Sequence, residues 1–393
     1  NYAEATSFFS IKLILYIIIL GVIPSIYIIK AKIINVTVRR FLVITSLTLL
    51  FILALIFANA SNWLWIDKNS KTLGGLAMPW CYSVNTSLFY VHKYKENEKE
   101  ILLPNATIKD SQKTVVVLVI GESARSQNFS LYGYGKNTNP LLSKMPDIFH
   151  FNATSCATYT TAGVKCILAH TNTNDLYEIL PNYLYRNGIE VIWRTTNWGE
   201  PPIHIKNYQS AEALMKNCKG EGCNYDEILL TDLKEQISAS TKNKVLIVLH
   251  TSTSHGPTYN KKYPPQFEIF KPVCNSVELG KCSHSELINA YDNTIGYTDY
   301  ILHHVIEDLK QLKEYKSAMI FVSDHGESLG EKNLYMHGLP LSLAPKEQYE
   351  IPFIVWMSDN SSKQLKPNNM LSQNHVFHSV LNFLGIESPV YNE

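Results

Sequence analysis

Three apolar runs of the sequence are each followed by acidic or imidazole side chains. In chain order they are the run 114–120 with Glu122, the run 245–250 with His255, and the run 318–322 with Asp324 and His325. If the runs are parallel strands, their carboxyl ends meet at one edge of a sheet, where ligands bind. Carboxylates and imidazoles together suit Zn²⁺ or Mn²⁺ better than Ca²⁺. A single Asp-His pair is more often a surface or capping feature, but three such segments at one edge predict a metal site.

A candidate nucleophile lies in the segment 156–166, which reads CATYTTAGVKC and holds Thr158, Thr160 and Thr161. A hydroxyl at a helix N-terminus and beside a metal ion would be stabilised as an alkoxide and could meet an incoming phosphate. On composition alone, a threonine-rich turn that caps a helix is the better explanation. The nucleophile hypothesis therefore depends on whether this segment meets the predicted metal site.

The elements that must position these residues follow an alternating pattern. The run 114–120 is apolar and β-branched throughout, as is typical of a strand buried on both faces. Similar strand-like runs occur at 190–194, 245–250, 318–322 and 352–357. Helical patterns lie between or after them, at 173–187, 225–240, 282–311 and 374–384. This alternation predicts an α/β fold in which helices cover both faces of a parallel sheet.

The first 60 residues are dominated by two apolar stretches, at about 8–29 and 41–60. Each is long enough to cross a hydrocarbon core of roughly 30 Å. Cationic side chains lie between the stretches, at Lys30, Lys32, Arg39 and Arg40. By the positive-inside rule this loop is cytoplasmic, and everything after the second stretch lies on the other side. Two buried core helices are the alternative, but a core helix rarely lacks a polar face over this length.

The sequence thus divides into three predicted parts. Residues 1–60 are a transmembrane region, residues 61–112 are an interfacial segment followed by a linker, and residues 113–393 are an exoplasmic domain that carries the candidate site. The formal net charge of the chain is +1. This charge gives no basic footprint, so it argues against a nucleic-acid binder that works by phosphate neutralisation.

Six of the seven cysteines form close pairs in the exoplasmic part: Cys156 with Cys166, Cys218 with Cys223, and Cys274 with Cys282. In an oxidising compartment, three local disulfides are the natural interpretation, although six cysteines allow fifteen connectivities. A thiolate zinc site is the alternative, but no pair has the CxxC spacing. Cys81 remains as a predicted free thiol.

Several longer motifs occur in order along the chain: VVVLVIGESARSQNFSLYGY (115–134), SCATYTTAGVKC (155–166), SHGPTYNKKYP (254–264), SDHGESLGE (323–331), YMHG (335–338) and APKEQ (344–348). In these motifs the chain resembles the phosphoethanolamine transferases that modify lipid A, a branch of the alkaline phosphatase and sulfatase superfamily. The resemblance implies a sulfatase-like α/β fold with a mixed, mostly parallel sheet, preceded by transmembrane helices. The family has five such helices, of which this chain is expected to keep the last two.

The resemblance also implies roles for individual residues. The catalytic zinc ligands are expected to be Glu122, Thr160, Asp324 and His325, with Thr160 as the nucleophile. Two further histidines, His255 and His337, are expected to surround the transferred group or to bind a second, weaker zinc ion.

The nucleophile segment departs from the family pattern at Ala157, Tyr159 and Thr161, where the family has a glycine, a small residue and an alanine. Counting from Cys156 still places Thr160 at the nucleophile position, with Thr161 as an extra hydroxyl beside it. The opening NYAEA resembles the end of a family segment, which makes Glu4 a candidate lipid-headgroup contact, although an ordinary juxtamembrane charge explains it nearly as well. Asn197, after the run 190–194, is a further candidate substrate contact.

The implied activity is a two-step transfer of phosphoethanolamine from phosphatidylethanolamine, through a phosphothreonine, to lipid A, lipooligosaccharide or another envelope glycan. The implied location is the bacterial inner membrane with the catalytic domain in the periplasm, and the implied outcome is resistance to cationic peptides such as polymyxin. Three alternatives remain: a phosphoglycerol transferase of the lipoteichoic-acid-synthase type, a membrane-anchored phosphatase or sulfatase-like hydrolase, and a tethered binding protein without metal. The sequence lacks the CxPxR setting that a formylglycine sulfatase needs.

Overall fold

The computed structural model describes residues 15, 17–31, 36–58, 83–87, 90, 100–359 and 370–392. The chain divides into two compact units, residues 1–60 and residues 61–393. Glu4, Cys81 and most of the predicted interfacial segment lie outside the described residues.

The N-terminal unit contains an apolar helix, α4 (Val38–Ala58), whose residues are all exposed. Its 21 residues make it about 31 Å long. In the described part of the chain, α4 is the one helix that is both long and apolar enough to cross a membrane. The described part of the first predicted span is also helical: the π-helical turns of η1 (Ile17–Val22) lead into α3 (Ile23–Lys30). Pro24 is the second residue of α3, at the point where the π-helical turns change to an α-helix.

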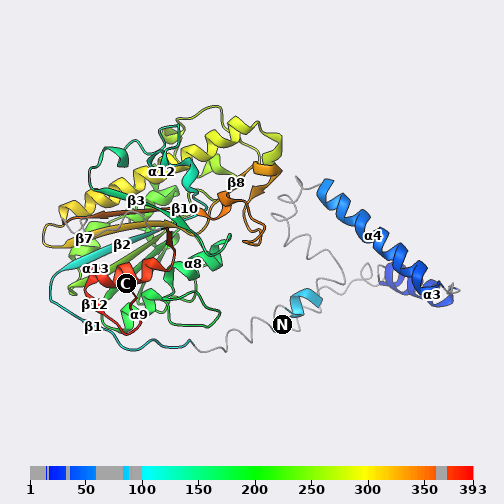
Figure 1. Cartoon of the computed structure of the whole chain (residues 1–393), viewed down its shortest axis with the longest axis horizontal. Helices are drawn as coiled ribbons and strands as arrows, with labels where there is room; N and C mark the ends of the chain where they lie inside the picture. Colours follow the sequence, from blue (N-terminus) through cyan, green and yellow to red (C-terminus); the bar gives the residue numbers. More distant parts are fainter. Residues whose placement is uncertain are drawn as a thin grey trace. The chain divides into compact units, whose positions relative to one another are not determined.

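The C-terminal unit is built on an eight-stranded sheet (Figure 1). Its order is β11 (Leu371–Ser372), β3 (Ile148–Thr154), β10 (Glu350–Met357), β7 (Lys316–Ser323), β2 (Thr114–Gly121), β6 (Lys244–His250), β4 (Glu190–Thr195) and β5 (Asn207–Ser210). Neighbouring strands are parallel except that β10 is antiparallel to both β3 and β7. The predicted α/β class, with a mixed and mostly parallel sheet, is confirmed.

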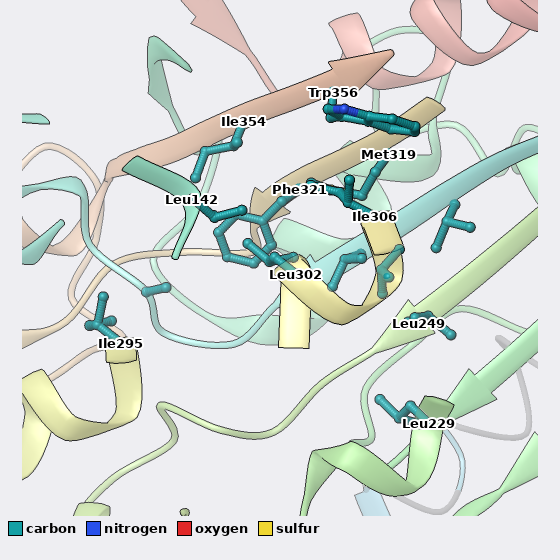
Figure 2. Close-up of a cluster of buried hydrophobic side chains, with 14 of the residues drawn as sticks. Leu142, Leu229, Leu249, Ile295, Leu302, Ile306, Met319, Phe321, Ile354 and Trp356 are labelled. Carbon is teal, nitrogen blue, oxygen red and sulfur yellow. The ribbon is translucent and has the colours of Figure 1, made fainter. Parts of the chain in front are cut away.

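Helices cover both faces of this sheet, as predicted. One face packs against α12 (His284–Gln311), and the other against α8 (Thr160–Leu168), α9 (Leu180–Arg186) and α13 (His375–Leu384). Figure 1 shows α12 and α13 on opposite sides of the strands. Successive side chains of β2 point to opposite faces, so Val117 packs on the α12 side and Leu118 on the α13 side. Figure 2 shows the first of these cores, where Leu302 of α12 lies close to Phe321 of β7.

Smaller elements complete the unit. Two short antiparallel pairs join β1 (Thr107–Ile108) to β12 (Ile386–Glu387) and β8 (Ser328–Leu329) to β9 (Tyr335–Met336). Short helices in the connections are η3 (Ser126–Asn128), η4 (Ser130–Tyr132), η5 (Leu142–Lys144), α10 (Ala211–Leu214), η6 (Glu221–Asn224), η7 (Asp226–Leu230), α11 (Leu233–Ser238), η8 (Tyr259–Lys261), η9 (Pro265–Phe267), η10 (Leu279–Lys281), η11 (Glu331–Asn333) and η12 (Lys346–Gln348).

Two predicted helices are wrong in their extent. The pattern at 173–187 becomes helical only at Leu180, because polar turn residues precede it and Pro181 starts α9. The pattern at 225–240 is broken at Asp232, whose φ of 52° lies in the left-handed region, so η7 and α11 are separate. Besides the strands of two residues, two strands were not predicted. β3 (IFHFNAT) and β5 (NYQS) contain polar residues and lie toward the sheet edges, so they lack a continuous apolar run.

Three disulfides join the cysteines in the predicted local pairs: Cys156–Cys166, Cys218–Cys223 and Cys274–Cys282. The first ties the segment before α8 to the body of that helix. It therefore constrains the loop that carries the candidate nucleophile.

Candidate active site

The predicted site residues meet at the carboxyl-end edge of the sheet. Glu122 follows β2, Asp324 and His325 follow β7, and Thr160 is the first residue of α8. All four side chains are buried. Because β2 and β7 are adjacent and parallel, their ends bring residues about 200 positions apart into contact.

Thr160, Glu122 and His325 form a compact triangle. Thr160 Oγ1 lies 3.3 Å from Glu122 Oε2 and 3.4 Å from His325 Nε2. His325 Nε2 lies 3.3 Å from Glu122 Oε1. The other two threonines of the segment are placed differently, because the Thr158 hydroxyl donates to the carbonyl of Leu339 and Thr161 is exposed. Among the three hydroxyls, Thr160 is the one at the cluster.

The donor atoms of this cluster fit a metal ion. His325 Nδ1 donates to the carbonyl of Gly326 at 2.8 Å, so Nε2 is the ring atom that faces the carboxylates and would bind an ion after losing its proton. Asp324 Oδ1 accepts hydrogen bonds from the backbone N–H groups of Ser123 and His325. Asp324 Oδ2 is buried and accepts no hydrogen bond from the residues that the structure describes. A buried carboxylate oxygen of this kind is the donor that a cation completes, and carboxylates with imidazole suit zinc.

The pKa shifts of the Glu122 and Asp324 carboxylates also favour a bound cation. Burial opposes ionisation of Glu122, but the hydrogen bond and positive charge of His325, with His255 and His337 nearby, hold its pKa well below the usual value. Burial and the negative charge of Glu122 raise the pKa of Asp324 well above its usual value. Two acids this close cannot both ionise without a compensating cation.

Local backbone geometry sets these positions. Ser123 adopts a left-handed φ of 53°, which is uncommon for a residue other than glycine, and its hydroxyl donates to Glu122 Oε1 at 2.7 Å. Tyr159 is extended and precedes the first turn of α8, so the positive end of the helix lies at Thr160. A Cβ on Gly163 would lie 2.2 Å from the carbonyl oxygen of Asp324, so glycine allows α8 to approach the loop that carries Asp324 and His325.

The two further histidines lie beside the cluster. The rings of His337 and His325 are 4.2 Å apart, and those of His337 and His255 are 5.8 Å apart. Ligand atoms of Glu122, His325 and His337 all lie within 4.8 Å of one another. His337 is thus placed to join the first metal group as well as to act with His255.

Asn197 also reaches the cluster. Its Nδ2 donates to Glu122 Oε2 at 2.7 Å and to the carbonyl of Thr251 at 2.9 Å. These bonds orient the Glu122 carboxylate and link the loops after β4 and β6. The structure therefore brings together every predicted site residue among those it describes, whereas Glu4 lies outside them.

Two residues of the site were not predicted. Glu327 is buried, and both its carboxylate oxygens lie 3.3 Å from His337 Nδ1. The sequence could have indicated Glu327, since it is the second acidic residue of the SDHGES stretch, which also holds Asp324 and His325. Gln373 donates to the carbonyl of Asp324 and accepts from the N–H of Cys156. It therefore joins the loop after β7 to the segment 156–166, which carries Thr160. A lone glutamine 49 residues away from Asp324 carries no such signal.

Comparison with known proteins places this geometry in a family. Residues 114–386 match the sulfatase family model, and residues 1–94 match the model of the phosphoethanolamine transferases EptA/EptB. The phosphoethanolamine transferase EptA of Helicobacter pylori is 44% identical over 401 residues, which cover 99% of this chain and 76% of that protein. The phosphatidylethanolamine transferase Mcr-1 of Escherichia coli is 33% identical over 387 residues, which cover 91% of this chain and 71% of that protein.

A solved structure agrees with these sequence matches. The integral membrane protein lipooligosaccharide phosphoethanolamine transferase A (EptA) from Neisseria meningitidis superposes with a TM-score of 0.70 at 29% identity. The match covers 100% of this chain and 78% of that chain. The chain therefore belongs to the phosphoethanolamine transferases of the EptA family, which are transferase enzymes, and the family predicted from its motifs is confirmed.

Proposed function

We propose that this protein transfers phosphoethanolamine from phosphatidylethanolamine to lipid A or another envelope glycan, through a covalent phosphothreonine on Thr160 and with bound zinc. The observation that carries the proposal is the buried Thr160 hydroxyl, which lies at the start of α8 and within 3.4 Å of Glu122 and His325. A helix N-terminus beside paired acids and an imidazole suits a hydroxyl that attacks a phosphate.

Glu122, Asp324, His325 and Thr160 would hold the catalytic zinc, and His255 with His337 would hold a second, weaker ion. Bound zinc lowers the pKa of a coordinated hydroxyl and polarises a phosphoryl oxygen. The carboxylate oxygen of Asp324 that accepts no hydrogen bond in the described structure supports this ligand set.

In the first step, Thr160 Oγ1 forms a bond to the phosphorus of the donor, and the bond from phosphorus to the glycerol oxygen breaks. Glu122 Oε2, 3.3 Å away and favoured in its ionised form, is placed to take the hydroxyl proton. The positive end of α8 stabilises the charge that develops on the phosphate.

The leaving oxygen of diacylglycerol needs a proton. When no second ion is bound, His337 is positioned to give one from Nε2, because its Nδ1 faces Glu327. In the second step, an oxygen of the acceptor attacks the same phosphorus, and the Thr160 oxygen leaves and regains its proton.

Donor, acceptor and location follow from the relatives and the chain. One relative is named a phosphatidylethanolamine transferase, and another is a membrane enzyme named for lipooligosaccharide. The apolar helix α4 would anchor the protein in the bacterial inner membrane, where both lipids occur. The cationic loop before α4 and the three disulfides support a catalytic domain in the oxidising periplasm. Addition of ethanolamine amines would lower the negative charge of the cell surface and so reduce binding of polymyxin.

Intact mass spectrometry with peptide mapping tests the covalent step. The zinc-loaded full chain, reconstituted with phosphatidylethanolamine, should gain one phosphoethanolamine on Thr160. A Thr160→Ala variant should gain none, whereas Thr161→Ala, which removes the neighbouring exposed hydroxyl, should gain as much as the wild type. An adduct on Thr161, or none in a folded and zinc-loaded sample, would contradict the proposal. Release of free phosphoethanolamine without transfer to added lipid A would indicate a hydrolase.

A further inference from the structure

A surface pocket of about 540 Å³ adjoins the nucleophile. It is lined by Asn197, Trp198, Gly199, Glu200, Pro201, Pro202, Ile203 and Tyr208. A Cβ on Gly199 would lie 3.3 Å from Cγ2 of Thr160, and Asn197 donates to Glu122. One end of the pocket therefore borders the point where a phosphate on Thr160 would sit.

Glu200 gives this pocket a negative charge. Its Oε1 accepts a hydrogen bond from the Tyr208 hydroxyl at 2.6 Å, and its Oε2 lies 3.6 Å from Nδ1 of the buried His250. Burial opposes ionisation of Glu200, but the nearby His250 and the hydrogen bond from Tyr208 lower its pKa below the usual value. No lysine or arginine is among the residues that line the pocket. In the described part of the chain, no lysine or arginine forms an ion pair with Glu200. Glu200 Oε2 is buried and has no hydrogen-bond partner among the described residues, so it is an acceptor that a bound cationic group would complete.

Two aromatic rings accompany this carboxylate. Trp198 is 65% exposed and Tyr208 is 42% exposed, which is unusual for side chains of this size. An aromatic face attracts a cation through its quadrupole, and tryptophan does so best. A fixed carboxylate with two aromatic rings is a combination that recognises an ammonium group, whereas an anionic acceptor phosphate would be repelled.

We propose that Trp198, Glu200 and Tyr208 form the subsite for the primary ammonium of phosphoethanolamine while its phosphate is at Thr160. This inference rests on the proposed function. Only two carbons separate the ester oxygen from the ammonium nitrogen in this group, and Glu200 directly follows Gly199, where an added Cβ would lie 3.3 Å from Thr160 Cγ2. The subsite explains how the enzyme would distinguish phosphatidylethanolamine from lipids whose headgroups lack a cation.

Two chromogenic diesters test the subsite with the zinc-loaded full chain in detergent. One is p-nitrophenyl phosphorylethanolamine, and the other is p-nitrophenyl propyl phosphate, in which a methyl group replaces the ammonium. The wild type should favour the ammonium substrate about tenfold in kcat/KM, and Glu200→Gln should reduce this ratio to about one or two. The ratio cancels any general loss of activity. Trp198→Ala, which removes an exposed side chain and keeps the fold, should lower the ratio about threefold.

The matched control is Glu221→Gln, which removes an exposed acid outside the pocket and should keep the wild-type ratio. A wild-type ratio near one, or an unchanged ratio in both Glu200→Gln and Trp198→Ala, would overturn the subsite while the Thr160 adduct still forms. A wild type that cleaves neither diester and forms no adduct on Thr160 would refute the proposed function, and the subsite with it.

Discussion

At the scale of single residues, Gly163 shows how closely α8 approaches the loop that carries Asp324 and His325. A Cβ at this position would lie 2.2 Å from the backbone oxygen of Asp324, and a backbone atom of a buried loop cannot move aside easily. The glycine therefore has a steric role in α8, in spite of the cost of glycine inside a helix.

Gly163→Ala should destabilise the protein by about 2 kcal/mol or more, because α8 must shift away from Asp324. The control is Gly296→Ala in α12, where the nearest atom to a new Cβ, the carbonyl oxygen of Thr138, is 3.9 Å away. That change should be neutral or stabilising by up to about 1 kcal/mol. Thermal unfolding of the two variants measures both effects, and equal midpoints would show that α8 accommodates the methyl group.

A second residue links stability to pH. Asp299 is buried and accepts hydrogen bonds from the backbone N–H groups of Leu141 and Leu142. Burial raises its pKa to about 7, in spite of those hydrogen bonds. Since the folded state then holds a proton that the unfolded state loses near pH 4, the contribution of this group to stability falls as pH rises from about 4 to 7.

Asp299→Asn should therefore gain stability relative to the wild type as pH rises from 5 to 8. The upper bound of this change is about 3 kcal/mol, because the folded and unfolded states differ in protonation mainly between pH 5 and the folded pKa of about 7 in this window. Urea unfolding of both proteins at the two pH values measures it. A stability difference that is the same at pH 5 and pH 8 would show that Asp299 is ionised in the folded protein throughout.

At the scale of elements, α12 is the longest described helix of the C-terminal unit and supports one face of the sheet. It begins with a capping box, in which the Ser283 hydroxyl accepts from the N–H of Glu286 and the Glu286 carboxylate accepts from the N–H of Ser283. This arrangement satisfies two backbone donors that have no partner within the helix.

Ser283→Ala should reduce the free energy of unfolding by about 1 kcal/mol, because the N–H group of Glu286 loses its side-chain acceptor. Ser283→Asp should retain most of it, since aspartate is an equally good N-cap. Chemical denaturation distinguishes the two variants. Equal losses in both would mean that the serine acts through something other than its acceptor oxygen.

At the scale of the whole molecule, the chain combines an apolar N-terminal unit with a folded C-terminal unit. The cationic loop before α4 predicts that the C-terminal unit lies outside the cytoplasm. Protease added to spheroplasts should therefore digest the C-terminal unit and spare the loop at residues 30–40. Protection of the C-terminal unit in intact spheroplasts, with digestion after lysis, would reverse this orientation.

The sequence by itself determined the features that depend on local pattern. Continuous apolar runs identified β2, β4, β6, β7 and β10, because a strand buried on both faces needs apolar side chains throughout. The residues after those runs identified the edge of the sheet where the site lies, since parallel strands all end there. Charge and apolar length predicted the membrane part, and the motifs identified the family.

Only the tertiary structure decided which side chains meet. The polar strands β3 and β5 are strands because of their neighbours in the sheet, not because of their own pattern. The family pattern pointed to Thr160, but the contact of its hydroxyl with Glu122, 38 residues away in the chain, arises only on folding. The support from Gln373 and the pocket of Trp198, Glu200 and Tyr208 likewise arise from packing between loops. Such contacts are set by the folded core, and no local period of the sequence records them.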